Sequence, residues 1–160
     1  MQLPQPVDQA LAPLLKAYPM DRMLASLVPT GPVSADAVRM VHEIAGDPAI
    51  ASNPAIPAGL WLYVDELDRS HQISQQLKDS TGSFWHGIMH RREGDFWNAK
   101  YWFDRAGSHP AMSTIAGYDA FRFVDAVEAF ANTRTGDETA LVDLQRREWV
   151  ALFAWCATRT

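Results

Sequence analysis

The segment from Ser83 to Pro110 constrains the fold of this chain more than any other. It holds three of the six tryptophans and three of the five histidines, mixed with arginines and further aromatic residues. Gly94 and Asp95 divide the segment, because glycine commonly ends a helix and aspartate caps the start of the next one. The pattern predicts a helical hairpin over residues 83–107 that carries a polar cluster among its aromatic side chains.

The rest of the chain shows apolar residues at helical spacing and no alternation typical of strands, which predicts an all-α fold. A length of 160 residues suits one domain. We therefore expect a single domain over residues 1–160, built as a compact bundle of six to eight helices. The hairpin is expected at its centre, with the C-terminal helix packed against it.

Prolines and capping residues predict where the helices before the hairpin begin and end. Pro13 has no amide donor, which predicts two short helices between Val7 and Tyr18. The segment 47–59 contains three prolines, which predicts a loop and a hinge. Further helices are expected over residues 21–28, from 34 or 36 to 46, and over 60–77. A break near Ser70, which could cap a new short helix, is the alternative for the last of these.

After the hairpin, the sequence predicts two more helices. Residues 118–131 have one polar and one apolar face, which predicts an amphipathic helix. A terminal helix is expected to begin at Asp137 or Thr139. Gln145 and Glu148 fall within the broad apolar face of that last helix. Burying them alone would cost a few kcal/mol, so we expect each to have a partner or to lie at a rim.

Charge and composition exclude several classes of function. Fourteen basic and nineteen acidic side chains give a formal charge of −5 with no basic tract, so nucleic acid is not expected as a partner. No apolar run reaches the roughly 20 residues of a membrane span, and the N-terminus lacks the basic start of a secretory signal. The single Cys156 lies in an apolar run, which favours a buried thiol. We expect a cytoplasmic protein without membrane contact.

Histidines are the strongest candidates for chemistry. His86 and His90 are four residues apart and share a helix face, and Glu93 follows in the same sector. Neutral imidazoles at this spacing commonly begin a zinc, iron or manganese site, which His71, Asp68 and Asp65 of the preceding helix could complete. The cofactor that this pattern suggests is a divalent transition metal.

A bare HxxxH pattern is common by chance, so two alternatives stay open. The histidines could be structural, each hydrogen-bonded to a carbonyl or a carboxylate inside the core. They could also form a metal-free polar pocket in which His71, His86 or His90 acts as a catalytic acid or base, or binds an anion.

Other polar and aromatic residues are candidates for ligand binding. Arg91 lies at a helix end, where it can complement the helix dipole or turn inward and clamp a carboxylate or phosphate, a role that Lys100 could share. The aromatic residues around the second helix of the hairpin predict that it lies buried in the middle of the bundle. The full set of candidate ligand-binding residues is Asp68, Gln75, Arg91, Asn98, Lys100, Tyr101 and Trp102.

The hairpin is similar to a single tetratricopeptide repeat. Gly87 falls at the small position of that repeat's first helix, whereas His86 and His90 replace its usual Leu and Tyr. The match covers about residues 80–110 and has no second copy, so it implies a hairpin inside a bundle rather than a solenoid. The matching residues of the second half are Gly94, Asp95, Phe96, Ala99, Phe103, Ala106 and Pro110.

Two longer phrases, DELDRSHQISQ and WHGIMHRREGDFWNAKYWF, also resemble a family of uncharacterised bacterial proteins that carry much the same pair of motifs. This resemblance implies a fold and no activity.

Three functions follow as hypotheses. The first is a protein whose interior pocket of His, Asp and Arg side chains binds a small molecule or metal, with enzymatic activity left open. The second is an interaction module in which the hairpin presents Trp97 and Tyr101 to a protein partner or to a second copy in a homo-oligomer. The third is a purely structural network of histidines.

Overall fold

The computed structural model describes residues 1–159, and these contain helices and no β-strand. The expected all-α fold is confirmed, with nine α-helices and one 3₁₀ helix (η1) over the described residues instead of six to eight helices. In chain order they are α1 (Gln5–Ala17), α2 (Ala35–Ala45), α3 (Pro48–Ala51), α4 (Ala55–Tyr63), α5 (Leu67–Ser74), α6 (Ser80–Glu93), α7 (Phe96–Ala106), η1 (Pro110–Thr114), α8 (Ala120–Thr133) and α9 (Glu138–Ala157).

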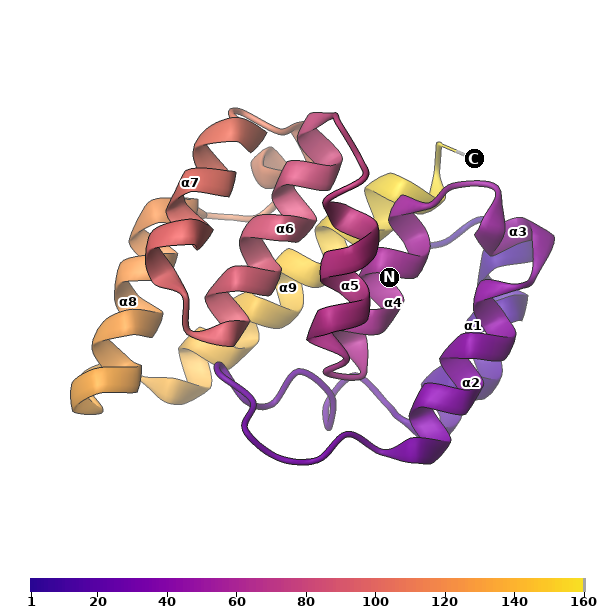
Figure 1. Cartoon of the computed structure of the whole chain (residues 1–160), viewed down its shortest axis with the longest axis horizontal. Helices are drawn as coiled ribbons and strands as arrows, with labels where there is room; N and C mark the ends of the chain where they lie inside the picture. The colour runs from indigo at the N-terminus through magenta and orange to yellow at the C-terminus, as the bar shows by residue number, and fades with distance from the viewer. Residues whose placement is uncertain (160) are drawn as a thin grey trace.

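Helix α6 lies in the middle of the molecule, between α5 and α7, with α9 behind it (Figure 1). Every residue from Gly82 to Arg92 is buried, polar residues included. Asp79 caps the first turn by accepting the Gly82 amide at 2.8 Å. Gly94 ends the helix at a φ of 82°, a left-handed conformation that glycine adopts without steric cost.

Helices α6 and α7 form the expected hairpin. Asp95 caps α7 by accepting the backbone amide of Asn98. Gly87 lets α7 approach closely, because a Cβ at this position would lie 3.0 Å from the ring of Phe103. The prediction that α7 lies buried in the middle of the bundle is wrong, since its Trp97 is 75% exposed. Only one face of α7 is covered, because it lies at the side of the molecule (Figure 1).

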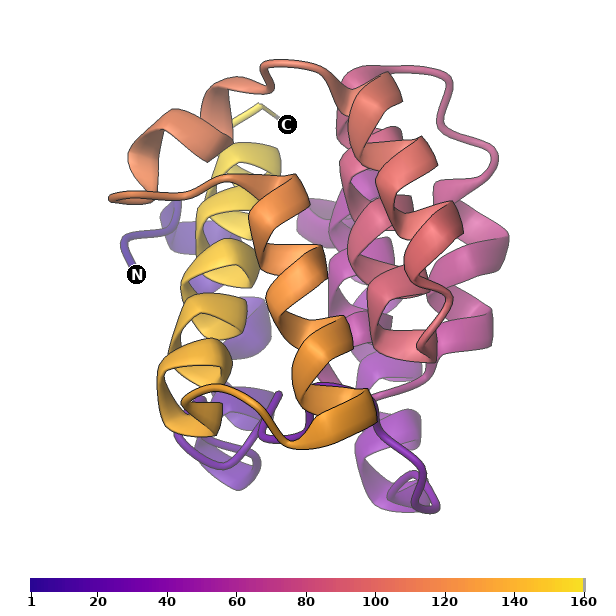
Figure 2. The same ribbon diagram turned by 90° about the vertical axis from the view of Figure 1, so that its left-hand side faces the viewer.

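The C-terminal helix α9 packs against α4 and α6, and α8 lies beside it (Figure 2). Trp149 of α9 donates its indole N–H to the carbonyl of Gly59 at 2.8 Å. Gly59 has no room for a side chain, because a Cβ there would come within 2.7 Å of Trp85. A smaller apolar cluster lies under α8, made of Leu27, Phe123, Val127, Phe130 and Val142.

Two predictions for the N-terminal part are wrong. Helix α1 runs unbroken through Pro13 because the proline removes only one backbone hydrogen bond, while the helix buries an apolar face. Residues 21–28 form no α-helix and belong to the loop between α1 and α2. Side chains of α9 hold the backbone of this loop: Arg146 donates to the carbonyls of Asp21 and Met23.

The segment 47–59 holds α3 and the start of α4 instead of a hinge loop. Its prolines fit because Pro48 opens α3 and Pro57 lies in the first turn of α4, where backbone amides need no helical partner. The helix expected over 60–77 is interrupted between α4 and α5, where Asp65 has a φ of 65°. The Asp65 carboxylate accepts from Arg92 of α6 at 2.6 Å, a tertiary contact that holds this turn.

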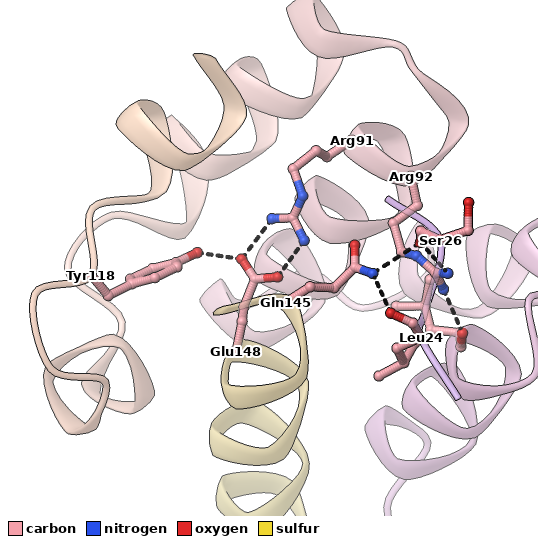
Figure 3. Close-up of polar contacts among 8 residues, drawn as sticks. Leu24, Ser26, Arg91, Arg92, Tyr118, Gln145 and Glu148 are labelled. Atoms are coloured by element: carbon pink, nitrogen blue, oxygen red, sulfur yellow. Dashed lines mark hydrogen bonds and ion pairs between the residues drawn. The ribbon is translucent and has the colours of Figure 1, made fainter. Parts of the chain in front are cut away.

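Gln145 and Glu148 are buried and have partners, as the sequence predicted. Glu148 accepts two hydrogen bonds from Arg91, at 2.7 and 2.5 Å, and a third from the hydroxyl of Tyr118 (Figure 3). Gln145 donates to the carbonyls of Leu24 and Ser26 in the loop between α1 and α2. Of the two orientations open to Arg91, the structure has the inward one, against a carboxylate of the protein itself.

Candidate functional site

The three histidines singled out by the sequence lie together where α5 packs against α6. His86 and His90 project from one face of α6, and His71 of α5 faces both. The ring centroid of His71 lies 4.7 Å from that of His86 and 5.3 Å from that of His90. One nitrogen of each ring lies within 4.8 Å of the others. We call these three residues the histidine cluster.

The turn at Asp65 explains this meeting. A single straight helix over residues 60–77 would carry His71 onward along the axis of α4. The interruption after Tyr63 instead redirects the chain, and α5 runs back beside α6 (Figure 1). Arg92, two residues beyond His90, holds this turn through Asp65, so α6 carries two of the three histidines and also the residue that positions the third.

His86 is the most buried member of the cluster, with 2% of its surface exposed. Its ring stacks on Trp102 of α7 with centroids 3.9 Å apart and planes 8° from parallel. Neither ring nitrogen has a hydrogen-bond partner within the described chain. Burial, and then the neighbouring His90 and His71, lower the pKa of His86 to about 3. It is therefore a neutral imidazole at physiological pH.

His90 has a defined orientation, because its Nδ1 lies 3.0 Å from Oε2 of Glu93. The carboxylate can only accept, so Nδ1 carries the proton and the lone pair is on Nε2. Burial lowers the pKa of His90, and the charge of Glu93 opposes that shift. His90 thus presents an unprotonated nitrogen, as a metal ligand must.

The remaining candidate residues on α5 and α6 lie outside the cluster. Asp68 and Gln75 are exposed on α5. Asp68 lines a small surface cavity together with Glu93. Arg91 is fully buried, with its guanidinium bonded to Glu148 and 4.1 Å from the centre of the Phe123 ring.

The candidates on α7 divide into two groups. Asn98 donates its side-chain amide to Asp95 within the helix cap, and Lys100 forms an ion pair with Asp125 of α8. Trp102 touches the histidine cluster through its stack on His86, and Tyr101 contacts Trp102 edge-on. Of the seven candidate ligand-binding residues, Trp102 alone is in ring contact with a histidine of the described chain.

Sequence reasoning missed the partners that organise the surroundings of the cluster. The Arg91–Glu148 pair joins residues 57 positions apart, and the Arg92–Asp65 pair joins residues 27 apart. One signal was present, since Glu148 stood inside an apolar helix face and required a buried partner. Asp65, a candidate metal ligand from the sequence, accepts from Arg92 and is not among the grouped ligand atoms of the three histidines.

Among the surface cavities of the described chain, five have volumes of about 350 to 620 Å³, and the three histidines line none of these five. The largest of the five lies between α9, η1 and the first two residues. The histidine cluster is a compact group of side chains outside these five cavities.

None of the helices over residues 1–159 combines the length and apolar character needed to cross a bilayer. Comparisons with protein-family models, with curated proteins and with solved structures found no match to this chain.

Proposed function

We propose that this protein binds one divalent transition metal ion through His71, His86 and His90. The observation that carries the proposal is His86, a deeply buried imidazole with no hydrogen-bond partner for either nitrogen. Buried polar groups are almost always satisfied, so such a group needs an explanation. A metal ion between the three rings supplies one, whereas a structural histidine would be bonded to a carbonyl or carboxylate.

The electrostatics of the cluster favour a ligand set over an acid or base. Burial lowers the pKa values of His86 and His90, so both present neutral imidazoles at physiological pH. Neutral imidazole suits zinc, copper, iron and nickel. His90 donates its Nδ1 proton to the carboxylate of Glu93. In metal sites, a carboxylate bonded in this way to the non-ligating nitrogen orients the histidine ligand.

Binding would draw the rings together. Metal–nitrogen bonds of about 2.0 to 2.1 Å in a tetrahedral site place neighbouring ligand nitrogens about 3.3 Å apart. The nitrogens of the cluster now spread over up to 4.8 Å. His71 is the least buried of the three and the one we expect to move inward. Three protein ligands leave a fourth position for water or an exchangeable ligand, which keeps enzymatic use of the site open.

A second function has one observation in its favour. Trp97 and Tyr101 are 75% and 46% exposed on one side of α7, as an interaction module would present them. The proposal of a metal site does not depend on a partner at this surface.

The proposed function also includes a cytoplasmic location, which the single buried Cys156 supports.

The test is elemental analysis of untagged protein purified without chelator, followed by titration of the metal-free protein with Co²⁺. We expect near-stoichiometric binding and the visible absorption bands of cobalt with nitrogen ligands. The His86→Ala/His90→Ala variant should lose both signals. His42→Ala is the matched control, because His42 is an exposed histidine on α2 and should leave binding intact. Equal metal contents in the wild type and the double variant would refute the proposal.

A further inference from the structure

A series of aromatic rings leads from the histidine cluster to the surface along α7. Trp102 stacks on His86 at 3.9 Å, and Tyr101 meets Trp102 edge-on at 5.4 Å. Trp97 then stacks on Tyr101, with centroids 6.2 Å apart and planes 11° from parallel. Exposure rises from 2% at His86 to 75% at Trp97. We call His86, Trp102, Tyr101 and Trp97 the aromatic series.

Helix geometry explains why the series is continuous. Trp97 and Tyr101 are four residues apart and therefore neighbours on the surface of α7. Trp102 follows directly in the sequence and turns toward α6, so the series crosses from one helix to the other there. The guanidinium of Arg105 lies 5.7 Å from the centre of the Tyr101 ring and 5.5 Å from that of Trp102, which holds the middle of the series in place.

The exposed end of the series adds little to the stability of the fold. Trp97 is 75% exposed, and hydrophobic stabilisation scales with the apolar area removed from water. Trp85 and Trp149, by contrast, are buried in the core. Trp97 is therefore open to contact with a partner at the surface.

We propose that the aromatic series carries single electrons between a copper ion in the histidine cluster and a redox partner at Trp97. This inference rests on the proposed metal site. Copper is chosen because imidazole ligands suit it and because its two common oxidation states differ by one electron. Electron transfer does not require the partner to reach the metal through a cavity. It is therefore compatible with a histidine cluster that lines none of these five cavities.

The step balances in electrons and protons. A one-electron oxidant at the surface takes an electron from Trp97 and is reduced by one electron. Tyr101 refills Trp97 and releases its hydroxyl proton to water, which its 46% exposure allows, and it regains a proton when Trp102 refills it. Cu(I) then supplies the electron that Trp102 has lost and becomes Cu(II). A one-electron donor drives the same transfer in reverse. The formal charge of −5 favours a cationic partner in either direction.

The test uses anaerobic protein loaded with Cu(I) and photogenerated tris(bipyridine)ruthenium(III), a cationic one-electron oxidant strong enough to oxidise tryptophan. The appearance of Cu(II) after each flash is followed by electron paramagnetic resonance. We expect the wild type to form Cu(II) rapidly, and the Tyr101→Leu and Trp97→Leu variants to lose this rapid phase. Both variants should keep the same copper content and melting temperature, because the replaced side chains lie at the surface.

Phe121→Leu is the matched control, because Phe121 is an aromatic residue of α8 that is 43% exposed and outside the series. It should oxidise copper as fast as the wild type. Equal rates in Tyr101→Leu and the wild type would overturn the electron-transfer inference while leaving the metal site intact. Failure of the wild type to bind Cu(I) would instead refute the metal site, and this inference with it.

Discussion

Glu93 is the residue that orients the buried imidazole of His90. Its Oε2 accepts the Nδ1 proton of His90 at 3.0 Å, which leaves the lone pair on Nε2. Carboxylates behind histidine ligands raise ligand basicity and fix the ring, and their loss typically costs about 10- to 100-fold in metal affinity. Glu93→Ala should therefore weaken metal binding by about this factor, measured by competition titration against a chromophoric chelator.

Glu93→Gln should fall between Glu93→Ala and the wild type, because the amide oxygen still accepts the proton but carries no charge. Glu43→Gln is the matched control, since Glu43 lies exposed on α2. An unchanged affinity in Glu93→Ala would mean that His90 is not held as a ligand in this way.

Helices α6 and α9 are joined by the buried pair of Arg91 and Glu148. Both side chains are fully buried, and the two parallel hydrogen bonds are supplemented by the hydroxyl of Tyr118. Removing one partner leaves an uncompensated buried charge, which typically costs about 3 to 5 kcal/mol. Glu148→Leu should lower the free energy of unfolding by this amount in urea titrations, with the metal removed.

The double variant Arg91→Met/Glu148→Leu should recover much of that loss, because a well-packed apolar pair removes both charges. The exposed pair of Arg147 and Asp143 on α9 provides the control, and Asp143→Asn should change stability by less than about 0.5 kcal/mol. A double variant as unstable as Glu148→Leu would show that the cost arises from packing instead of charge.

The elements that sequence could predict are those with local signals. Four helix caps are the residues that their types indicated: Ser34 at α2, Gly94 and Asp95 at the hairpin, and Asp137 at α9. The turn at Asp65 was missed because it depends on Arg92, which lies 27 residues away and donates to its carboxylate. His86 and His90 could be placed on one face from their spacing, but their meeting with His71 depends on that turn.

At the scale of the whole molecule, segments from both ends of the chain enclose α6. The loop between α1 and α2 runs along the lower side in Figure 1 and is bonded by Gln145 and Arg146 of α9. These contacts join positions more than 100 residues apart. Contacts between such distant positions do not affect the local spacing of apolar residues. The local pattern therefore predicts a helix over residues 21–28, where the structure has a loop.

The pH dependence of global stability should reveal a buried histidine outside the cluster, His109. Its Nδ1 accepts the Ala111 amide at the start of η1, and its Nε2 lies 3.2 Å from the hydroxyl of Thr81 on α6. Burial lowers the pKa of His109, with Asp79 opposing and Arg159 reinforcing the shift. The unfolded chain therefore takes up a proton near pH 6.5 that the folded protein does not bind.

Stability is thus fully present above about pH 6.5 and falls as the pH drops below it. We expect urea unfolding of the metal-free protein to show a lower free energy at pH 5 than at pH 7.5. In His109→Asn this difference should shrink, because asparagine can accept the Ala111 amide without titrating. His42→Asn should keep the wild-type difference, since His42 is exposed. An undiminished difference in His109→Asn would assign the pH dependence to the histidine cluster, where burial also lowers the pKa of His86 and His90.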